Sequence, residues 1–276
     1  MSKPIIYQLF PRYFANYNET RAYNGSKEEN GCGRFADINK RALKSIVDLG
    51  ATHVWYTGII RHATAQYNNP AITKGKAGSP YAITDYYDVD PDLAKNESKR
   101  MQEFESLVKR THEAGLGVLI DFVPNHVARE YKSVCKPEGV EDLGENDHPE
   151  WAFSPLNNFY YLPGERFTMD KDLQGYEEFP AKVTGNDCFT SHPSENDWYE
   201  TVKLNYGVFY QGGREKQFDP IPSTWTKMRD IILFWAGKGI DGVRVDMAEM
   251  VPVEFFQWAI EAVKKKHKKF LFIGEC

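Results

Sequence analysis

Five short apolar runs along the chain have the length and the bounding residues of buried strands. They span residues 5–10, 51–60, 117–123, 239–247 and 270–276. Each run is too short for a typical helix, and Gly or Pro borders or interrupts every one of them. The pattern therefore predicts five strands, most of them buried on both faces.

Between the runs, apolar positions recur at the spacing of amphipathic helices. These stretches lie at residues 38–49, 101–115, 225–237 and 252–263. The order along the chain is β-α-β-α-β, a long irregular stretch, and then α-β-α-β. Repeated units of this kind form a parallel sheet, which is either open or closed into a barrel.

The irregular stretch runs from residue 128 to residue 222 and is rich in Pro, Gly, Asn and aromatic residues, without sustained periodicity. Unstructured loops of this length are rare inside a compact domain, so we interpret it as a small inserted domain. The barrel-type unit then consists of residues 1–127 and 223–276.

Composition and charge exclude several classes of partner. The net charge is only -5 and aromatic residues make up 14% of the chain, so there is no basic field for nucleic acid, whereas a neutral ligand such as a sugar fits. No run of eighteen apolar residues suggests a membrane segment, and the N-terminus has no signal-peptide pattern. We therefore expect no nucleic-acid or membrane partner and a cytoplasmic location.

The four cysteines carry no recognisable metal or redox motif. Cys32, Cys135, Cys188 and Cys276 are far apart, without a C-x-x-C pair. We expect free thiols, as is usual in a reducing compartment.

Charged residues cluster at the C-terminal ends of three successive predicted strands. Asp121 and His126 follow the third, Arg244 and Asp246 end the fourth, and Glu275 ends the fifth. Charge is costly to bury unless it is paired or used, and barrel folds place their chemistry at this end of the sheet. A structural ion pair that closes a strand end is the alternative interpretation.

Two carboxylates at neighbouring strand ends suit the hydrolysis of a glycoside. One protonates the leaving oxygen, while the other attacks the anomeric carbon or activates water. Arg244 beside Asp246 would favour the ionised form of this aspartate. Glu275, at the end of an apolar strand, would have a raised pKa, which suits an acid.

Several segments resemble the α-amylase family of glycoside hydrolases in order and spacing. Residues 121–126, 242–246 and 273–275 resemble its first three signature regions, 81–87 its Tyr-x-x-x-Asp-Tyr stretch, and 202–206 a signature of its inserted B domain. The resemblance extends along nearly the whole chain. It implies a TIM (β/α)8-type barrel, here its first five strands, with the catalytic barrel at residues 1–127 and 223–276 and domain B at residues 128–222.

The resemblance also implies roles for individual residues. Asp246 would be the nucleophile that forms a covalent glycosyl-enzyme intermediate, Glu275 the general acid and then base, and Arg244 the residue that positions Asp246. The sugar-binding residues would be Tyr81, which stacks on the sugar, and Asp121 and His126, which bind its hydroxyls. Asn125 matches a position that often serves a structural Ca²⁺.

Two departures from the family pattern affect this interpretation. Many members have Lys and His three and four positions after the nucleophile, where this chain has Glu249 and Met250. The fourth signature region, which carries a further catalytic Asp, is not found in these 276 residues, and five strands do not close an eight-stranded barrel.

From the sequence we expect a retaining glycoside hydrolase that acts on α-glucans such as starch and maltooligosaccharides. A transglycosylase of the same family is the alternative within the enzyme class, because a sugar hydroxyl can intercept the same intermediate. A catalytically incompetent fragment or sugar-binding remnant is the alternative from another class. The sequence does not distinguish α-1,4 from α-1,6 linkages.

Overall fold

The computed structural model describes residues 3–275, and its centre is a parallel sheet of five strands. The strands lie side by side in chain order: β1 (Ile6–Leu9), β2 (His53–Tyr56), β5 (Gly117–Phe122), β12 (Gly242–Val245) and β13 (Leu271–Gly274). The predicted α/β class and all five predicted sheet strands are confirmed. β1 and β13 form the two edges of the sheet.

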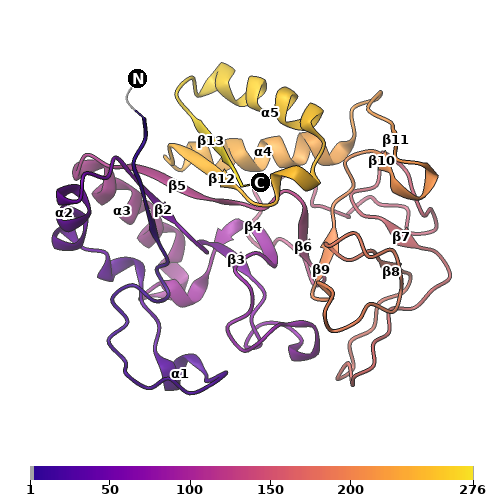
Figure 1. The fold of residues 1–276 in the computed structure, drawn as a ribbon, viewed down its shortest axis with the longest axis horizontal. Coiled ribbons are helices and arrows are strands. Elements are labelled where there is room, and N and C mark those ends of the chain that lie inside the picture. Colours follow the sequence, from indigo (N-terminus) through magenta and orange to yellow (C-terminus); the bar gives the residue numbers. More distant parts are fainter. Residues whose placement is uncertain (1–2, 276) are drawn as a thin grey trace.

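The long helices lie where the apolar periodicity predicts them. They are α2 (Lys40–Asp48), α3 (Arg100–Glu113), α4 (Ser223–Gly237) and α5 (Val253–Lys266). Asn39 caps α2, because its side chain accepts hydrogen bonds from the Arg41 and Ala42 amides. Figure 1 shows α2 and α3 at one end of the molecule and α4 beside α5 at the top. A short helix, α1 (Lys27–Asn30), was not predicted, since four residues carry no periodicity.

The second apolar run is interrupted, which differs from the single strand predicted over residues 51–60. β2 ends at Tyr56, and β3 (Ile60–His62) pairs instead with β4 (Ile83–Val89) as an antiparallel hairpin. Gly58 lies between them with a φ of 71°, a conformation that residues with a side chain rarely adopt. The turn at Gly58 therefore carries the chain out of the sheet.

Buried aromatic side chains fill the space between the helices and the sheet. Trp235 of α4 packs edge-to-face on Phe104 of α3, with ring centroids 5.6 Å apart. Its indole nitrogen donates to the Tyr86 carbonyl of β4 at 2.8 Å. A single continuous core thus joins the helices to the sheet and to the β3–β4 hairpin.

The stretch from residue 129 to residue 222 contains no α-helix, and the structure describes all of it. Its strands form short ladders: β9 (Thr201–Lys203) pairs with β6 (His126–Ala128), which directly precedes the stretch, β7 (Tyr161–Leu162) with β8 (Ala181–Lys182), and β10 (Val208–Phe209) with β11 (Glu215–Lys216). A separate apolar cluster supports it, including Tyr160, Phe167 and Val183. Figure 1 shows it on the side of the molecule away from α2.

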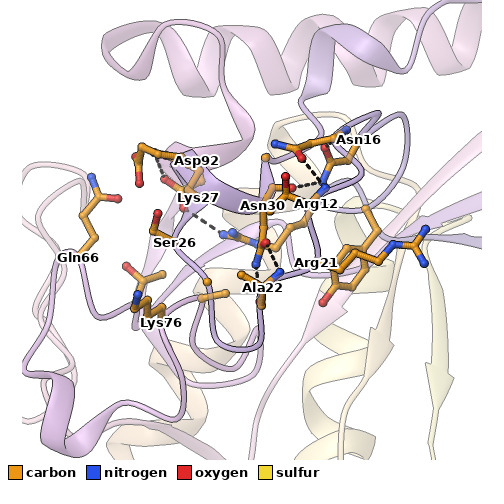
Figure 2. A pocket seen from close by; sticks show the side chains of 18 of the residues that line it. Arg12, Asn16, Arg21, Ala22, Ser26, Lys27, Asn30, Gln66, Lys76 and Asp92 are labelled. Atoms are coloured by element: carbon orange, nitrogen blue, oxygen red, sulfur yellow. Dashed lines mark hydrogen bonds and ion pairs between the residues drawn. The ribbon is translucent and has the colours of Figure 1, made fainter.

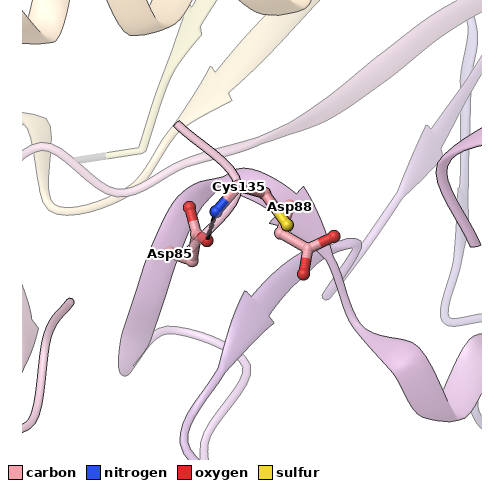
Figure 3. Close-up of side chains that lie close together, drawn as sticks. All are labelled: Asp85, Asp88 and Cys135. Carbon is pink, nitrogen blue, oxygen red and sulfur yellow. Dashed lines mark hydrogen bonds between the residues drawn. The ribbon is translucent and has the colours of Figure 1, made fainter. Parts of the chain in front are cut away.

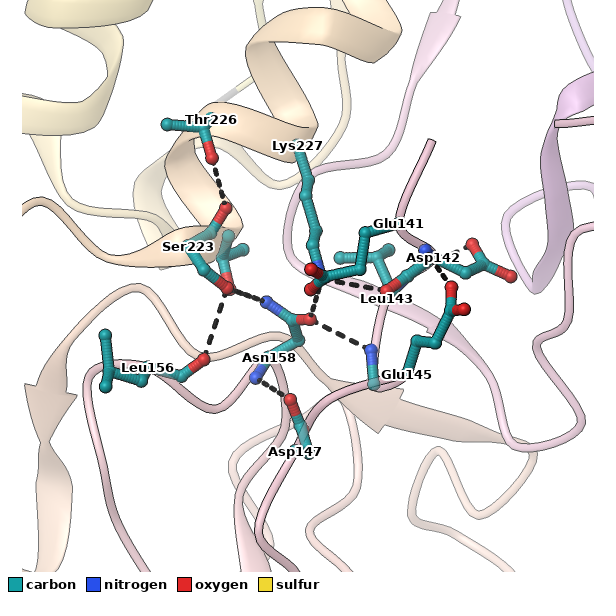
Figure 4. Close-up of polar contacts among 12 residues, drawn as sticks. Glu141, Asp142, Leu143, Glu145, Asp147, Leu156, Asn158, Ser223, Thr226 and Lys227 are labelled. Atoms are coloured by element: carbon teal, nitrogen blue, oxygen red, sulfur yellow. Dashed lines mark hydrogen bonds and ion pairs between the residues drawn. The ribbon is translucent and has the colours of Figure 1, made fainter. Parts of the chain in front are cut away.

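A polar network fixes this inserted segment to α4 (Figure 4). The Lys227 ammonium donates to the Asp142 carbonyl and to Asn158 Oδ1, both at 2.8 Å. The Asn158 amide in turn donates to the hydroxyls of Ser223 and Thr224, at the start of the helix. The network therefore ties two loops of the segment to one helix terminus.

Two further expectations bear on the described residues. Cys32, Cys135 and Cys188 are free thiols, as predicted, whereas Cys276 lies outside the described residues. Within residues 3–275, none of the helices has the length and apolar character needed to cross a membrane.

Candidate active site

Strand register brings the predicted catalytic residues side by side. Arg244 in β12 lies opposite Asp121 in β5 and Ile273 in β13. Asp246 and Glu275 directly follow their strands, and their amides continue the sheet ladder to the Phe122 and Val245 carbonyls. Because the strands are parallel, these side chains meet at one edge of the sheet.

Arg244 is the centre of this cluster. Its Nη1 donates to Asp246 Oδ1 at 2.8 Å and to Asp121 Oδ1 at 3.4 Å, and its Nη2 pairs with the Glu275 carboxylate. The guanidinium is buried and lies 5.0 Å from the ring centroid of Trp55 and 5.6 Å from that of Tyr81. We call these six residues the strand-end site.

The Asp246 carboxyl is harder to ionise than an exposed aspartate. Burial raises its pKa to about 6, and the neighbouring Glu275 carboxylate acts in the same direction. Arg244 opposes this shift but does not cancel it. As expected, Arg244 lowers the pKa of Asp246 and so favours its ionised form, but burial raises this pKa by more.

The pKa of Asp121 is also raised, although both of its carboxylate oxygens accept hydrogen bonds. Its carboxylate accepts from the Gly58 amide at 2.9 Å and from the Trp55 indole at 3.1 Å. Burial nevertheless raises its pKa to about 6. The turn at Gly58 thus orients a carboxylate on a neighbouring strand.

Glu275 has surroundings that differ from those predicted. We expected an apolar setting, but its side chain is half-exposed and pairs with Arg244. β13 is an edge strand in the described chain, so no further strand covers the position beside Glu275. The apolar setting expected for Glu275 is therefore not found in the structure described here.

Tyr81 lies just before β4 and is partly buried beside Arg244. Burial raises the pKa of its phenol to about 12, and the charge of Asp121 contributes to this rise. The phenol is therefore uncharged at neutral pH. A neutral aromatic ring at this position suits contact with the face of a sugar.

His126 and Asn125 belong to a neighbouring cluster rather than to the strand-end site. His126 packs against Trp198, with ring centroids 5.2 Å apart, and its Nδ1 lies 3.1 Å from Asn125 Nδ2. Burial and the charge of Lys203 lower the pKa of His126 to about 3. The imidazole is therefore neutral at physiological pH.

The donor set at Asn125 does not fit a calcium ion. Asn125 Oδ1 accepts from the buried Lys203 ammonium at 2.8 Å, and the Asp187 carboxylate also pairs with this ammonium, at 2.5 Å. Calcium requires six to eight oxygen ligands, and a second cation beside Lys203 would be repelled. The ammonium takes the place between the barrel and the inserted segment that a metal would need.

A second group of possible metal ligands, within residues 3–275, consists of Asp85, Asp88 and Cys135 (Figure 3). The Asp85 carboxylate is already bound by backbone amides, including that of Cys135. Asp88 forms ion pairs with Arg61 and Arg100. Two guanidinium groups neutralise this carboxylate, so the group is a structural network and not a metal site.

Two residues of functional interest were missed at the sequence level. Trp55 was not singled out, although it lies one residue before the end of β2 and its indole donates to Asp121 on the neighbouring strand. Lys203 was seen only as part of a motif. Lys203 is a buried charged residue between the apolar residues Val202 and Leu204. A charge within an apolar run is the criterion by which Arg244 was singled out.

Residues 8–271 match the family model described as "Alpha amylase, catalytic domain". The chain is 27% identical over 264 residues to an alpha-1,4-glucan:maltose-1-phosphate maltosyltransferase of Cereibacter sphaeroides, covering 93% of this chain and 35% of that protein. It is 24% identical over 242 residues to Maltase 1 of Drosophila virilis, covering 88% and 31%.

A solved α-amylase from Lactobacillus plantarum has a similar fold, with a TM-score of 0.59 and 27% identity. The superposition covers 99% of this chain and 45% of that one. The chain spans about a third of the length of the two curated relatives and under half of this solved chain. Its five-stranded sheet is thus a partial barrel of TIM type.

Proposed function

This chain belongs to the alpha-amylase family, and from that premise we propose that it acts on α-glucans as a retaining glycosidase. The observation that carries the proposal is the strand-end site. Asp246 and Glu275 lie on one guanidinium at adjacent strand ends, in the positions that the family resemblance assigns to the nucleophile and the acid.

The proposed reaction has two steps. Asp246 attacks the anomeric carbon while Glu275 donates a proton to the leaving glycosidic oxygen, so that the carbon–oxygen bond breaks and an ester to Asp246 forms. Glu275 then takes a proton from water, which displaces Asp246 with retention of configuration. Donation by Glu275 requires that its carboxyl exchange Arg244 for the glycosidic oxygen.

Substrate contacts are proposed for the remaining predicted residues. Tyr81 offers an uncharged ring to the sugar, and Asp121 offers a carboxylate that is already held by Gly58 and Trp55. His126, which is neutral and packs against Trp198, is proposed to bind a sugar hydroxyl rather than to transfer protons.

Transglycosylation is the second candidate, and the relatives support both outcomes. The Cereibacter sphaeroides protein is named as a transferase and the Drosophila virilis protein as a maltase. The two reactions share the ester intermediate and differ only in whether water or a sugar hydroxyl intercepts it. The two candidate functions therefore differ only in whether the acceptor is water or a sugar hydroxyl.

The test follows the products formed from maltooligosaccharides by the chain and by its Asp246→Asn and Glu275→Gln variants. Each variant should lower turnover by roughly 10³-fold or more, because it removes a group used in bond breaking. Glu275→Gln should affect substrates with a nitrophenol leaving group much less, since nitrophenolate leaves without protonation. New reducing ends indicate hydrolysis, and longer oligosaccharides indicate transfer.

Glu249→Gln is the matched control, because this exposed carboxylate lies on the turn that follows Asp246. Its turnover should stay close to that of the unaltered chain. Equal activity in Asp246→Asn and the unaltered chain would contradict the proposal. Maltooligosaccharide binding without turnover would indicate a sugar-binding protein instead.

A further inference from the structure

We propose that a cavity separate from the strand-end site binds a neutral oligosaccharide. The cavity measures about 690 Å³ and lies between the loop that contains residues 16–31 and the loop that contains residues 64–77 (Figure 2). The choice of an α-glucan as its ligand rests on the proposed function. None of the six residues of the strand-end site lines it.

The cavity opens on the same end of the sheet as the strand-end site. One wall follows β1, whose C-terminal end is parallel to those of β5 and β12. Ala77, on the other wall, precedes the sugar-stacking candidate Tyr81 by four residues. A glucan chain that extends beyond the strand-end site therefore has a nearby surface on which to bind.

Carboxylates within the lining and directly beside it balance the cations of the cavity, which favours a neutral ligand. Arg12 pairs with Asp90 at 3.0 Å and with Asp92 at 3.1 Å, and Lys27 pairs with Asp92 at 2.6 Å. Two cations of the lining thus face Asp92, within it, and Asp90, directly beside it. Arg21, Lys76 and Glu28 also line the cavity, and Glu29, outside the lining, lies 4.0 Å from Lys76. An anion would gain little here.

The lining also presents the groups that sugars use. Tyr13 exposes 70% of its surface, and its ring is held edge-to-face by Phe10, with centroids 4.9 Å apart. Gln66 is also exposed in the lining, and Figure 2 shows Ser26, Gln66 and Lys76 on one side with Arg21 on the other. An aromatic face with donors and acceptors spread around it suits a ligand of several linked rings.

One buried group has its hydrogen-bonding capacity unused. Thr64 lines the cavity and is only 3% exposed, yet its hydroxyl has no partner within the described chain. An unsatisfied buried hydroxyl is unfavourable, and such groups are rare in native proteins. A ligand hydroxyl reached by a change of the Thr64 rotamer would supply the missing partner.

The wall of the cavity is held in place before any ligand binds. Asn16 Nδ2 donates to the Asn30 carbonyl at 2.9 Å, and Asn18 Nδ2 donates to the Glu29 carbonyl at 3.0 Å. Asn30 in turn both donates to and accepts from the Ala22 backbone. The asparagines thus fold the loop on itself, so little ordering entropy opposes binding.

The experiment measures amide hydrogen exchange of the 276-residue chain during titration with maltohexaose and, separately, with inorganic phosphate. Residues 12–31 are the diagnostic segment, because they contain no residue of the strand-end site. The test variant combines Tyr13→Ala and Gln66→Ala. The control combines Tyr23→Ala, from the same loop but outside the lining, with Gln102→Ala on α3.

Maltohexaose should protect residues 12–31, and the concentration for half protection should rise about tenfold or more in the test variant but not in the control. Absence of protection, equal protection in the test variant, or protection by phosphate alone would each overturn the proposal. Protection without turnover would support this cavity and contradict the proposed enzyme. Turnover without protection would do the reverse.

Discussion

At the strand-end site one arginine pairs with three carboxylates, so negative charges outnumber positive ones there. Arg244 binds Asp121, Asp246 and Glu275, so that burial of the two aspartates is compensated only in part. Burial raises the pKa of each aspartate to about 6, because one guanidinium does not offset the loss of water around both carboxylates. Ionisation of Asp246 therefore falls within the range of ordinary buffers.

Asp246→Asn should make the chain more stable at pH 7.5 but not at pH 4. The folded-state pKa of Asp246 is about 6, above its ordinary value of 3.8, so the folded chain binds more protons than the unfolded chain between these values. Stability contributed by Asp246 is thus present below pH 4 and is lost as the pH rises through 6. Asparagine removes this loss, which is worth about 1–3 kcal/mol.

Urea unfolding of both chains at the two pH values measures this effect. The Glu249→Gln variant is the control, because it removes an exposed carboxylate on the turn that follows Asp246. A stability difference of the same size at pH 4 and pH 7.5 would contradict the proposed linkage.

Lys203→Met should lower the free energy of unfolding by about 3 kcal/mol or more, because it leaves the Asp187 carboxylate and the Asn125 oxygen without their buried cation. EDTA should leave the melting temperature of the unaltered chain unchanged, since an ammonium and not a metal holds this position. Thermal unfolding with and without EDTA measures both effects.

Lys216→Met serves as the control for that substitution, because the ammonium of Lys216 pairs with Glu254 at an exposed site and contributes little. If EDTA lowered the melting temperature while Lys203→Met did not, a bound metal would be the better explanation.

At the scale of elements, the inserted segment is attached to the barrel by both apolar and polar contacts. It has a small apolar cluster of its own, but Phe159 and Leu204 belong to the main core. Lys203 and the network around Lys227 and Asn158 make the connection at two places. We propose that residues 128–222 form a domain in their own right, as the sequence pattern predicts.

Lys227→Met should destabilise the junction by about 1–3 kcal/mol, because the Asp142 carbonyl and the Asn158 amide oxygen lose a partly buried charged donor. Limited proteolysis should become faster within residues 138–160. Lys238→Met, just after the same helix, removes a more exposed pair with Glu105 and should change neither property much. Cleavage at equal rates in the two variants would contradict this role of Lys227.

At the scale of the whole molecule, the pattern of apolar residues predicted both the sheet and the long helices. A strand buried on two faces leaves an unbroken apolar run, and a helix leaves apolar residues at helical spacing. The same reasoning failed at Gly58, because the residues before and after it pair in two different sheets. A continuous apolar run does not show where the pairing strand changes. It also failed for the setting of Glu275, which depends on what lies beside β13 and not on the sequence of that strand.

The strand-end residues were predictable for a similar reason, because charge at the end of an apolar strand stands out. Arg244, Asp246 and Asp121 meet as the sequence suggested. Trp55 was not recognised, since an aromatic residue in a strand looks like core. The partners of Asn125 were missed as well, because Lys203 lies 78 positions away and only the folded chain brings the two together.

The antiparallel pairing of β6 with β9 closes the inserted segment at its base, so the chain leaves and returns to the sheet region at nearly one point. Residues 129–200 are therefore a closed excursion that starts and ends beside the same two strands. Evolution can lengthen, shorten or exchange such an excursion while the sheet stays intact. The same ladder marks a natural boundary for transplanting this segment between homologues by protein engineering.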